Sequence, residues 1–132
     1  MLKKVLPFVF TLLLIASCRY DHVPDIAAVP PGCDTLHPSY HNCVVPILKA
    51  NCYSCHSDSA SNHGQSTFDM EDFTLFKNEL NLSYQGDTTY GSKFMAIIGQ
   101  RPLIIHMPPT GKLPQQDINT IQRWVTARAP EN

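Results

Sequence analysis

The chain has 132 residues, of which 43% are hydrophobic and 16% charged, and its formal net charge is −1. This length fits one domain with a modest core and leaves no room for a second. Lysine and arginine form no cluster, and removal of the first 17 residues would leave eight basic side chains against eleven acidic ones. The charge therefore argues against a nucleic-acid partner, which requires a basic patch or stripe.

The first residues have the order of a secretory signal. Lys3 and Lys4 precede an apolar run from Val5 to Ala16, as in the positively charged and hydrophobic parts of such signals. A run of this length is too short for a transmembrane helix, which needs roughly twenty apolar residues. The sequence therefore predicts export from the cytoplasm rather than a permanent membrane span.

The stretch that ends at Cys18, LIASC, resembles a bacterial lipobox. We expect residues 1–17 to be removed as a lipoprotein signal peptide and Cys18 to be acylated as the mature amino terminus. The alternative is ordinary cleavage nearby, with Cys18 left as a thiol. Lipidation implies a cell-envelope protein that faces the periplasm or lies on the surface, anchored in the inner or the outer membrane.

Two segments have the composition of irregular structure. Residues 18–40 carry Pro24, Pro30, Pro31 and Pro38 with little apolar periodicity, which is typical of an extended tether. The segment Ser57–Thr67 is rich in Ser, Asn and Gly and is predicted to be a mobile loop. The folded domain is therefore expected to span residues 41–130.

Short helices are predicted for the domain, and no segment shows the alternating pattern of a strand. They run from Val44 or Pro46 to Asn51, from Asp69 to about Asn81, from Ser92 to Ile98, and from Pro114 to about Arg128. Asp69 is the expected N-cap of the second helix, and Pro114 is the expected first residue of the last. The fold class is all-α. Helices this short are marginal alone, so we expect another group to complete the core.

The motif Cys52-Tyr53-Ser54-Cys55-His56 is the C-x-x-C-H signature of covalent haem attachment. Two thiols three positions apart can each add to one vinyl group of the porphyrin, and His56 is then placed to bind the iron. A thioredoxin-like redox pair is the alternative, but the chain lacks the βαβ pattern that would present it. A buried haem would also supply the missing core.

Cys33 and Cys43 are left once Cys18 is assigned to lipid and the motif cysteines to haem. In an oxidising compartment a disulfide between them is expected. Pairing with a thiol of another protein is the alternative. A structural zinc site made of Cys33, Cys43, Cys52 and Cys55 is a further hypothesis, although the ten-residue step from Cys33 to Cys43 is not a tight zinc knuckle.

The region from Cys43 to Arg128 resembles the small monohaem class I cytochromes c. The resemblance is carried by VPIL (45–48) leading into NCYSCH (51–56), by Met107-Pro108-Pro109, and by LPQQDI (113–118) opening a terminal helix with Trp124. It implies a cytochrome c-like fold of short helices wrapped around one covalently attached haem c. It also implies that Trp124 packs against the first helix, near Ile47 and Leu48.

In that family the methionine of such a loop is the distal iron ligand, which implies Met107 here, with His56 as the proximal ligand. Pro108 and Pro109 favour this role because they restrict the backbone and hold the loop extended. His106 is the rival ligand and would give a lower reduction potential.

The remaining candidate side chains are expected to have other roles. Met95 lies in an apolar helical stripe and is expected in the core. Arg101 and Lys112 are weak candidates for pairing with the haem propionates. Solvated side chains are expected for Met70, His63, His41, His37 and His22.

The sequence therefore predicts an electron carrier and not an enzyme. With both axial positions filled, no substrate can reach the iron, and redox partner proteins would dock transiently. Both an independent carrier and a subunit of a larger complex are compatible with this interpretation. The alternatives are a haem enzyme or gas sensor with an open sixth position, and a zinc-binding structural module.

Overall fold

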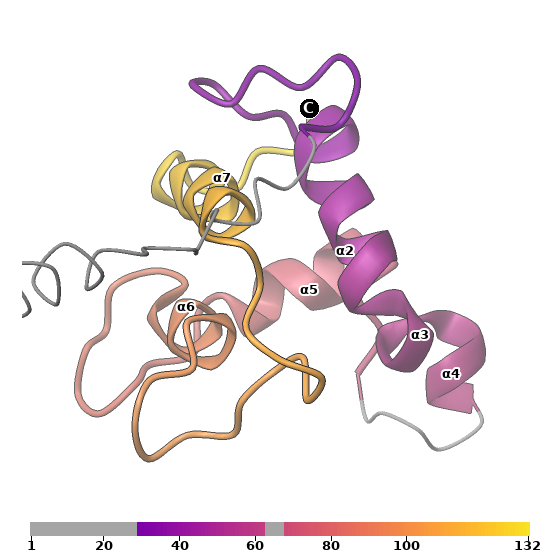
Figure 1. The fold of residues 1–132 in the computed structure, drawn as a ribbon. Helices are drawn as coiled ribbons and strands as arrows, with labels where there is room; N and C mark the ends of the chain where they lie inside the picture. The colour runs from indigo at the N-terminus through magenta and orange to yellow at the C-terminus, as the bar shows by residue number, and fades with distance from the viewer. Residues whose placement is uncertain (1–28, 63–67) are drawn as a thin grey trace, which may run out of the picture.

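A computed structural model describes residues 29–62 and 68–132. The predicted signal peptide, Cys18 and the first part of the predicted tether lie outside these ranges. The helical elements are η2 (Tyr40–Val44), α2 (Val45–Asn51), α3 (Tyr53–His56), α4 (Asp58–Asn62), α5 (Phe73–Glu79), α6 (Ser92–Ile98) and α7 (Gln115–Thr126) (Figure 1).

The described residues contain no strand, and their only β-type pairing is the isolated bridge between Tyr84 and Asp87. The prediction of an all-α fold is confirmed. Within the same ranges, no helix combines the length and apolarity that crossing a bilayer requires.

The first helices follow one another almost without interruption from Tyr40 to Asn62 (Figure 1). The predicted helix ending at Asn51 is confirmed as α2, with Pro46 in its first turn, where its missing N–H is tolerated. The predicted loop after His56 is wrong in its first part, because α4 occupies Asp58–Asn62. The Ser57 hydroxyl accepts a hydrogen bond from the Ala60 N–H at 3.2 Å, an N-cap interaction that favours this extra turn.

The start of α5 differs from the prediction. Asp72, not Asp69, is the N-cap, and its carboxylate accepts a hydrogen bond from the Leu75 N–H at 3.0 Å. The Asp69 carboxylate instead accepts from the Glu71 N–H at 2.8 Å, which makes a local turn before the helix. The helix therefore begins at Phe73, later than expected, and ends at Glu79.

The last two predicted helices are present. The bounds of α6, Ser92–Ile98, are those predicted, and Gly99 is its C-cap. Pro114 is the N-cap of α7 rather than its first helical residue, because its ψ of 140° is extended. Arg128 lies beyond the end of α7, with a φ of 70°.

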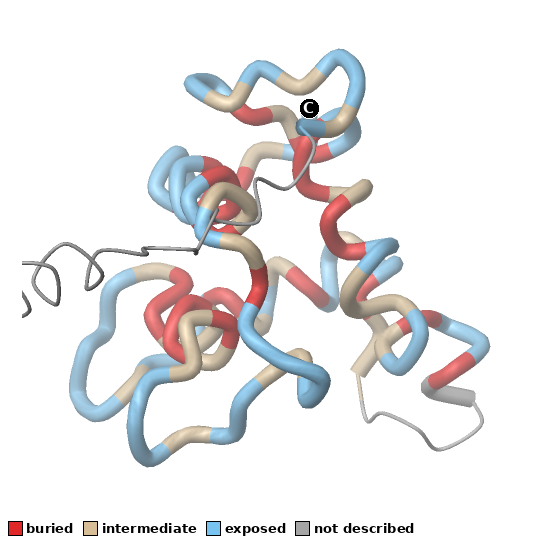
Figure 2. Tube along the Cα trace, viewed as in Figure 1, coloured by how far each residue is buried: buried red, intermediate tan, exposed pale blue. Residues whose placement is uncertain are grey.

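Trp124 of α7 is the centre of the core. Its indole is fully buried and stacks on Tyr40 and Phe76, with ring centroids 5.4 and 5.8 Å away. Its Nε1–H donates to the Pro130 carbonyl at 2.9 Å, so the polar atom is satisfied. Trp124 shares one buried cluster with Ile47 and Leu48, as expected. Figure 2 shows buried positions on α2, α6 and α7.

The segment before η2 is attached to the domain at several points. Cys33 and Cys43 form a disulfide, the pairing that the cysteine assignment predicted. The guanidinium of Arg123 donates to the Thr35 carbonyl at 2.7 Å, and Pro38 is buried. Residues 29–39 therefore lie against the domain, although they contain no helix.

We predict that Gly91→Ala destabilises the protein more than Gly86→Ala. Both glycines have positive φ, 78° and 84°, so an L side chain costs about 1–2 kcal/mol at either position. An added Cβ at Gly91 would overlap the Val125 side chain, whereas one at Gly86 meets no atom within 4 Å. The overlap adds about 1–3 kcal/mol of overpacking. Chemical denaturation should show this order; equal losses would contradict the close contact between Gly91 and α7.

Candidate functional site

A cavity of about 790 Å³ lies beside the motif turn and is lined by residues from several parts of the chain. Cys52, Cys55, His56 and Met107 all line it, although Met107 is remote from the other three in the sequence. Most of the remaining wall is apolar and includes Phe68, Met70, Phe94, Ile97, Ile98 and Ile105. The structure therefore brings together the candidate thiols, the candidate imidazole and the candidate thioether.

One helical turn places the three motif residues on the cavity side. The Cys55 and His56 N–H groups both donate to the Cys52 carbonyl, at 3.0 and 2.9 Å. Residues at i, i+3 and i+4 share one face of a helix, which explains why the motif spacing suits this wall. Burial raises the pKa of the Cys52 thiol to about 11, while Cys55 is exposed. Cys52 therefore lies deeper in the protein than Cys55.

The orientation of His56 is set by the segment that follows α4. Its Nδ1 lies 3.3 Å from the Phe68 carbonyl oxygen, and the two rings are 5.5 Å apart. A carbonyl oxygen only accepts, so Nδ1 carries the proton and donates it. In this tautomer Nε2 carries the lone pair that a metal ligand needs, and a backbone acceptor on the other ring nitrogen is the usual partner of a ligating histidine.

Met107 lies in the connection between α6 and α7. Its N–H donates to the Ile97 carbonyl at 3.4 Å, which holds the half-buried residue against α6. His106, the rival ligand, is exposed, and its Nε2 donates to the Arg101 carbonyl at 3.0 Å. His106 does not line the cavity, whereas Met107 and Pro108 do.

The prediction for Met70 is wrong. Met70 was expected to be solvated, but it is only 3% exposed and lines the cavity. Its N–H donates to the His56 carbonyl at 2.8 Å. This backbone hydrogen bond holds Met70 in the interior. The apolar periodicity of the neighbouring residues does not indicate this burial. Met70 is thus a second thioether at the site, attached beside the histidine, whereas Met107 is attached to α6.

The charged side chains at the cavity are Lys93 and Glu79, which the sequence did not single out. Arg101 and Lys112, the weak propionate candidates, are exposed and do not line the cavity. A signal for Lys93 exists, because it lies four residues before Ile97 on one face of the predicted helix. No comparable spacing in the sequence indicates that Glu79 lies at the cavity.

The cavity fits a covalently attached haem in size and in chemistry. Cofactor pockets typically measure about 300 to 1,000 Å³ and are mostly apolar with few polar groups. The donors are two thiols one turn apart, an oriented imidazole and two thioethers. A zinc site of four cysteines fits less well, because two of the sulfurs form the Cys33–Cys43 disulfide. Across 29–62 and 68–132, no group of three or more His, Cys, Asp or Glu is placed to hold a metal ion.

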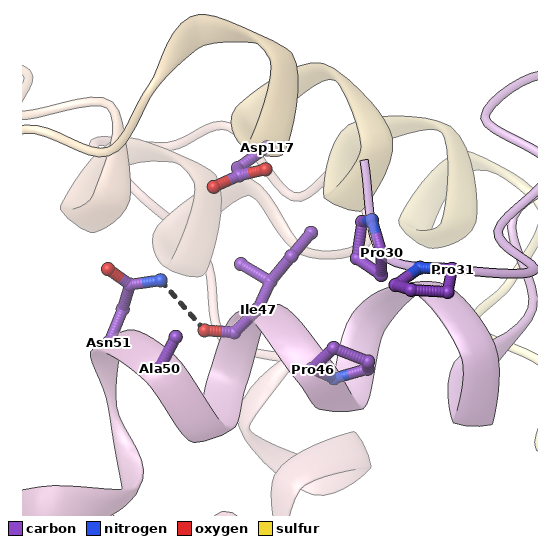
Figure 3. Close-up of a pocket in the computed structure, with 7 residues that line it drawn as sticks. All are labelled: Pro30, Pro31, Pro46, Ile47, Ala50, Asn51 and Asp117. Atoms are coloured by element: carbon purple, nitrogen blue, oxygen red, sulfur yellow. Dashed lines mark hydrogen bonds between the residues drawn. The ribbon is translucent and has the colours of Figure 1, made fainter. Parts of the chain in front are cut away.

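A smaller cavity of about 270 Å³ lies between α2, α7 and the Pro30–Pro31 segment. Figure 3 shows Asp117 of α7 across this cavity from Ile47 and Asn51 of α2. The Asn51 side-chain amide donates to the Ile47 carbonyl at 2.9 Å, within α2. Burial raises the pKa of the Asp117 carboxyl, so the fold disfavours its ionised form.

We predict opposite pH effects for Asp117→Asn and Asp87→Asn. At any pH above the raised pKa, Asp117 is ionised in both the folded and the unfolded state, so the shift is a loss of stability there. This loss disappears as the pH falls through the raised pKa toward 3.8. Wild type should therefore gain stability relative to Asp117→Asn on acidification.

Asp87 is the matched control, because hydrogen bonds from Thr89 lower its pKa. Its contribution is present above its unfolded pKa and is lost as the pH falls through the lower folded one. Wild type should therefore lose stability relative to Asp87→Asn on acidification. Free energies of unfolding measured from pH 7 to pH 3 test both signs, and a pH-independent difference for Asp117→Asn would contradict its burial.

Comparison of this chain with protein-family models, with curated proteins and with solved structures found no match. The function of the cavity is therefore inferred from the residues that line it.

Proposed function

We propose that this protein is a membrane-anchored monohaem c-type cytochrome that transfers single electrons and is not an enzyme. The observation that carries the proposal is that Met107 lines the same apolar cavity as Cys52, Cys55 and His56. The motif alone accounts for attachment of a haem. A soft sixth ligand in the same cavity adds the feature that separates an electron carrier from a haem with an open iron position.

Each residue has a distinct role in this proposal. The Cys52 and Cys55 sulfurs would hold the haem covalently, each by adding to one of its two vinyl groups. His56 would bind the iron through Nε2, because its Nδ1–H donates to the Phe68 carbonyl and fixes the ring. The haem, when bound, supplies a one-electron Fe(III)/Fe(II) couple.

The side chains on the Met107 side would set the potential. A thioether favours the reduced metal, so Met107 gives a higher potential than a second histidine. Ile97, Ile98 and Phe94 line the cavity and exclude water, which also disfavours the more highly charged oxidised state. Lys93, at the same cavity, is suited to pair with a haem carboxylate.

The location and the partners belong to the same proposal. Acylation of Cys18 would hold the domain at the cell envelope through the tether. Electron donors and acceptors would be redox proteins that dock transiently, with the protein acting alone or within a larger complex. A haem enzyme or gas sensor remains the alternative if Met107 does not bind the iron.

We predict that Met107→Leu and Met70→Leu have different effects on the visible spectrum of the matured protein. Leucine retains the packing volume of methionine but cannot ligate, so Met107→Leu should lose the six-coordinate low-spin state and the weak iron–methionine charge-transfer band. Met70→Leu should keep both. The Met70 N–H donates to the His56 carbonyl, so Met70 is held beside the histidine that would already bind the iron. The opposite pattern would assign the sixth ligand to Met70.

Met107→His provides a second readout. Histidine restores a sixth ligand, so the spectrum should stay low-spin, while the reduction potential falls. Redox titration measures the change. An unchanged potential, or wild-type protein that is already five-coordinate and high-spin, would contradict electron transfer through a His56/Met107 iron.

A further inference from the structure

The connection between α6 and α7 carries two exposed aliphatic side chains. Leu103 is 92% exposed and Ile105 is 63% exposed, and they lie among further exposed residues of this connection (Figure 2). Ile105 also lines the large cavity. We call residues 101–106 the aliphatic loop. Exposed aliphatic side chains at a loop tip indicate a surface that another phase or molecule covers.

The charge around this loop differs from that of the rest of the domain. Residues 88–116 contain Lys93, Arg101 and Lys112 and no aspartate or glutamate, whereas residues 29–87 and 117–132 together contain nine acidic and four basic side chains. Asp87 is near enough to Arg101 to interact with it, and Glu79 shares the cavity wall with Lys93. The connection that carries the aliphatic loop therefore has a positive formal charge, whereas the rest of residues 29–132 has a negative one.

An anionic lipid surface matches both properties of the loop. Aliphatic side chains flanked by cations bind at the boundary between headgroups and acyl chains, and lysine and arginine near the membrane are attracted by anionic lipid. The acidic remainder of the domain would be repelled by the same surface, which favours one orientation. A protein-binding surface would instead be expected to carry aromatic anchors, and residues 100–112 contain no Phe, Tyr or Trp.

The proposed anchor keeps this loop close to a bilayer. Residues 18–28 separate the acylated Cys18 from the described domain, and eleven residues span at most about 40 Å when fully extended. Tethering raises the effective concentration of the loop at the membrane, so weak contacts are sufficient to orient the domain.

We propose that the aliphatic loop docks on an anionic membrane surface, with Leu103 and Ile105 inserted between headgroups and Arg101 and Lys112 beside them. Docking turns the Ile105 edge of the cavity toward the bilayer. The inference rests on the proposed lipid anchor for proximity, but it does not require the haem.

Hydrogen exchange of the mature lipidated protein tests this proposal. The protein is reconstituted into vesicles of phosphatidylcholine with phosphatidylglycerol, into pure phosphatidylcholine vesicles, and into a neutral detergent. We expect the amides of residues 103–106 to exchange about tenfold more slowly in the anionic vesicles, as burial of aliphatic side chains would produce. High salt should reduce this protection, because it screens the cations.

Variants separate docking from simple proximity to the bilayer. The variant Leu103→Ser should lose most of the protection when compared with its own detergent sample. Leu36→Ser is the matched control, because Leu36 is also exposed, at 69%, but lies beside Asp34; it should keep the protection. Leu103 and Leu36 are both exposed and neither lines the large cavity, so the fold and the haem absorbance should be unaffected.

The proposal is overturned if exchange of residues 103–106 is the same in all three media, or if Leu103→Ser keeps the protection. Protection in detergent that increases with protein concentration would assign the loop to contacts with a second copy, which also overturns it. The haem absorbance of the same samples reports the proposed redox function separately, so failure of one proposal is distinguishable from failure of the other.

Discussion

The single helical turn from Cys52 to His56 constrains the rest of the structure. It directs two sulfurs and an imidazole to one wall of a large apolar cavity, and the Phe68–Met70 segment is attached to the same turn through both the ring and the backbone of His56. The helices around this cavity, α2, α5 and α6, have seven residues each, a length that is marginal without tertiary packing. In our proposal the haem supplies that packing and the redox function together.

The rest of the core is built around Trp124, and it shares Met70 and Ile98 with the wall of the cavity. Trp124 stacks between Tyr40 and Phe76, so η2, α5 and α7 meet around one indole. The disulfide joins the segment before η2 to η2 itself. α2 and α6 both contribute side chains to the same buried cluster. These two helices also hold parts of the candidate site, because α2 leads into Cys52 and α6 holds Met107 through Ile97.

The helices α2, α6 and α7 were predictable from the sequence, whereas the helical turn of the motif was not among the predicted helices. The exact start of α5, the presence of α4 and the burial of Met70 were not predictable from the sequence. Asp69 and Asp72 are both good caps, and only the folded chain shows which one begins α5. The polar segment at Asp58 forms a helix because Ser57 caps it. The burial of Met70 depends on a contact with His56 fourteen residues earlier, which local patterns do not contain.

The most direct measurement of the central claim is the intact mass of the protein purified from a host with a cytochrome c maturation system. Our account predicts the mass of the chain plus one haem, which remains attached after acid-acetone extraction and denaturation. The Cys52→Ala and Cys55→Ala variants should each lose one of the two thioether bonds. A colourless protein whose mass includes no macrocycle would contradict the account, because both the electron-transfer role and the filling of the cavity depend on it.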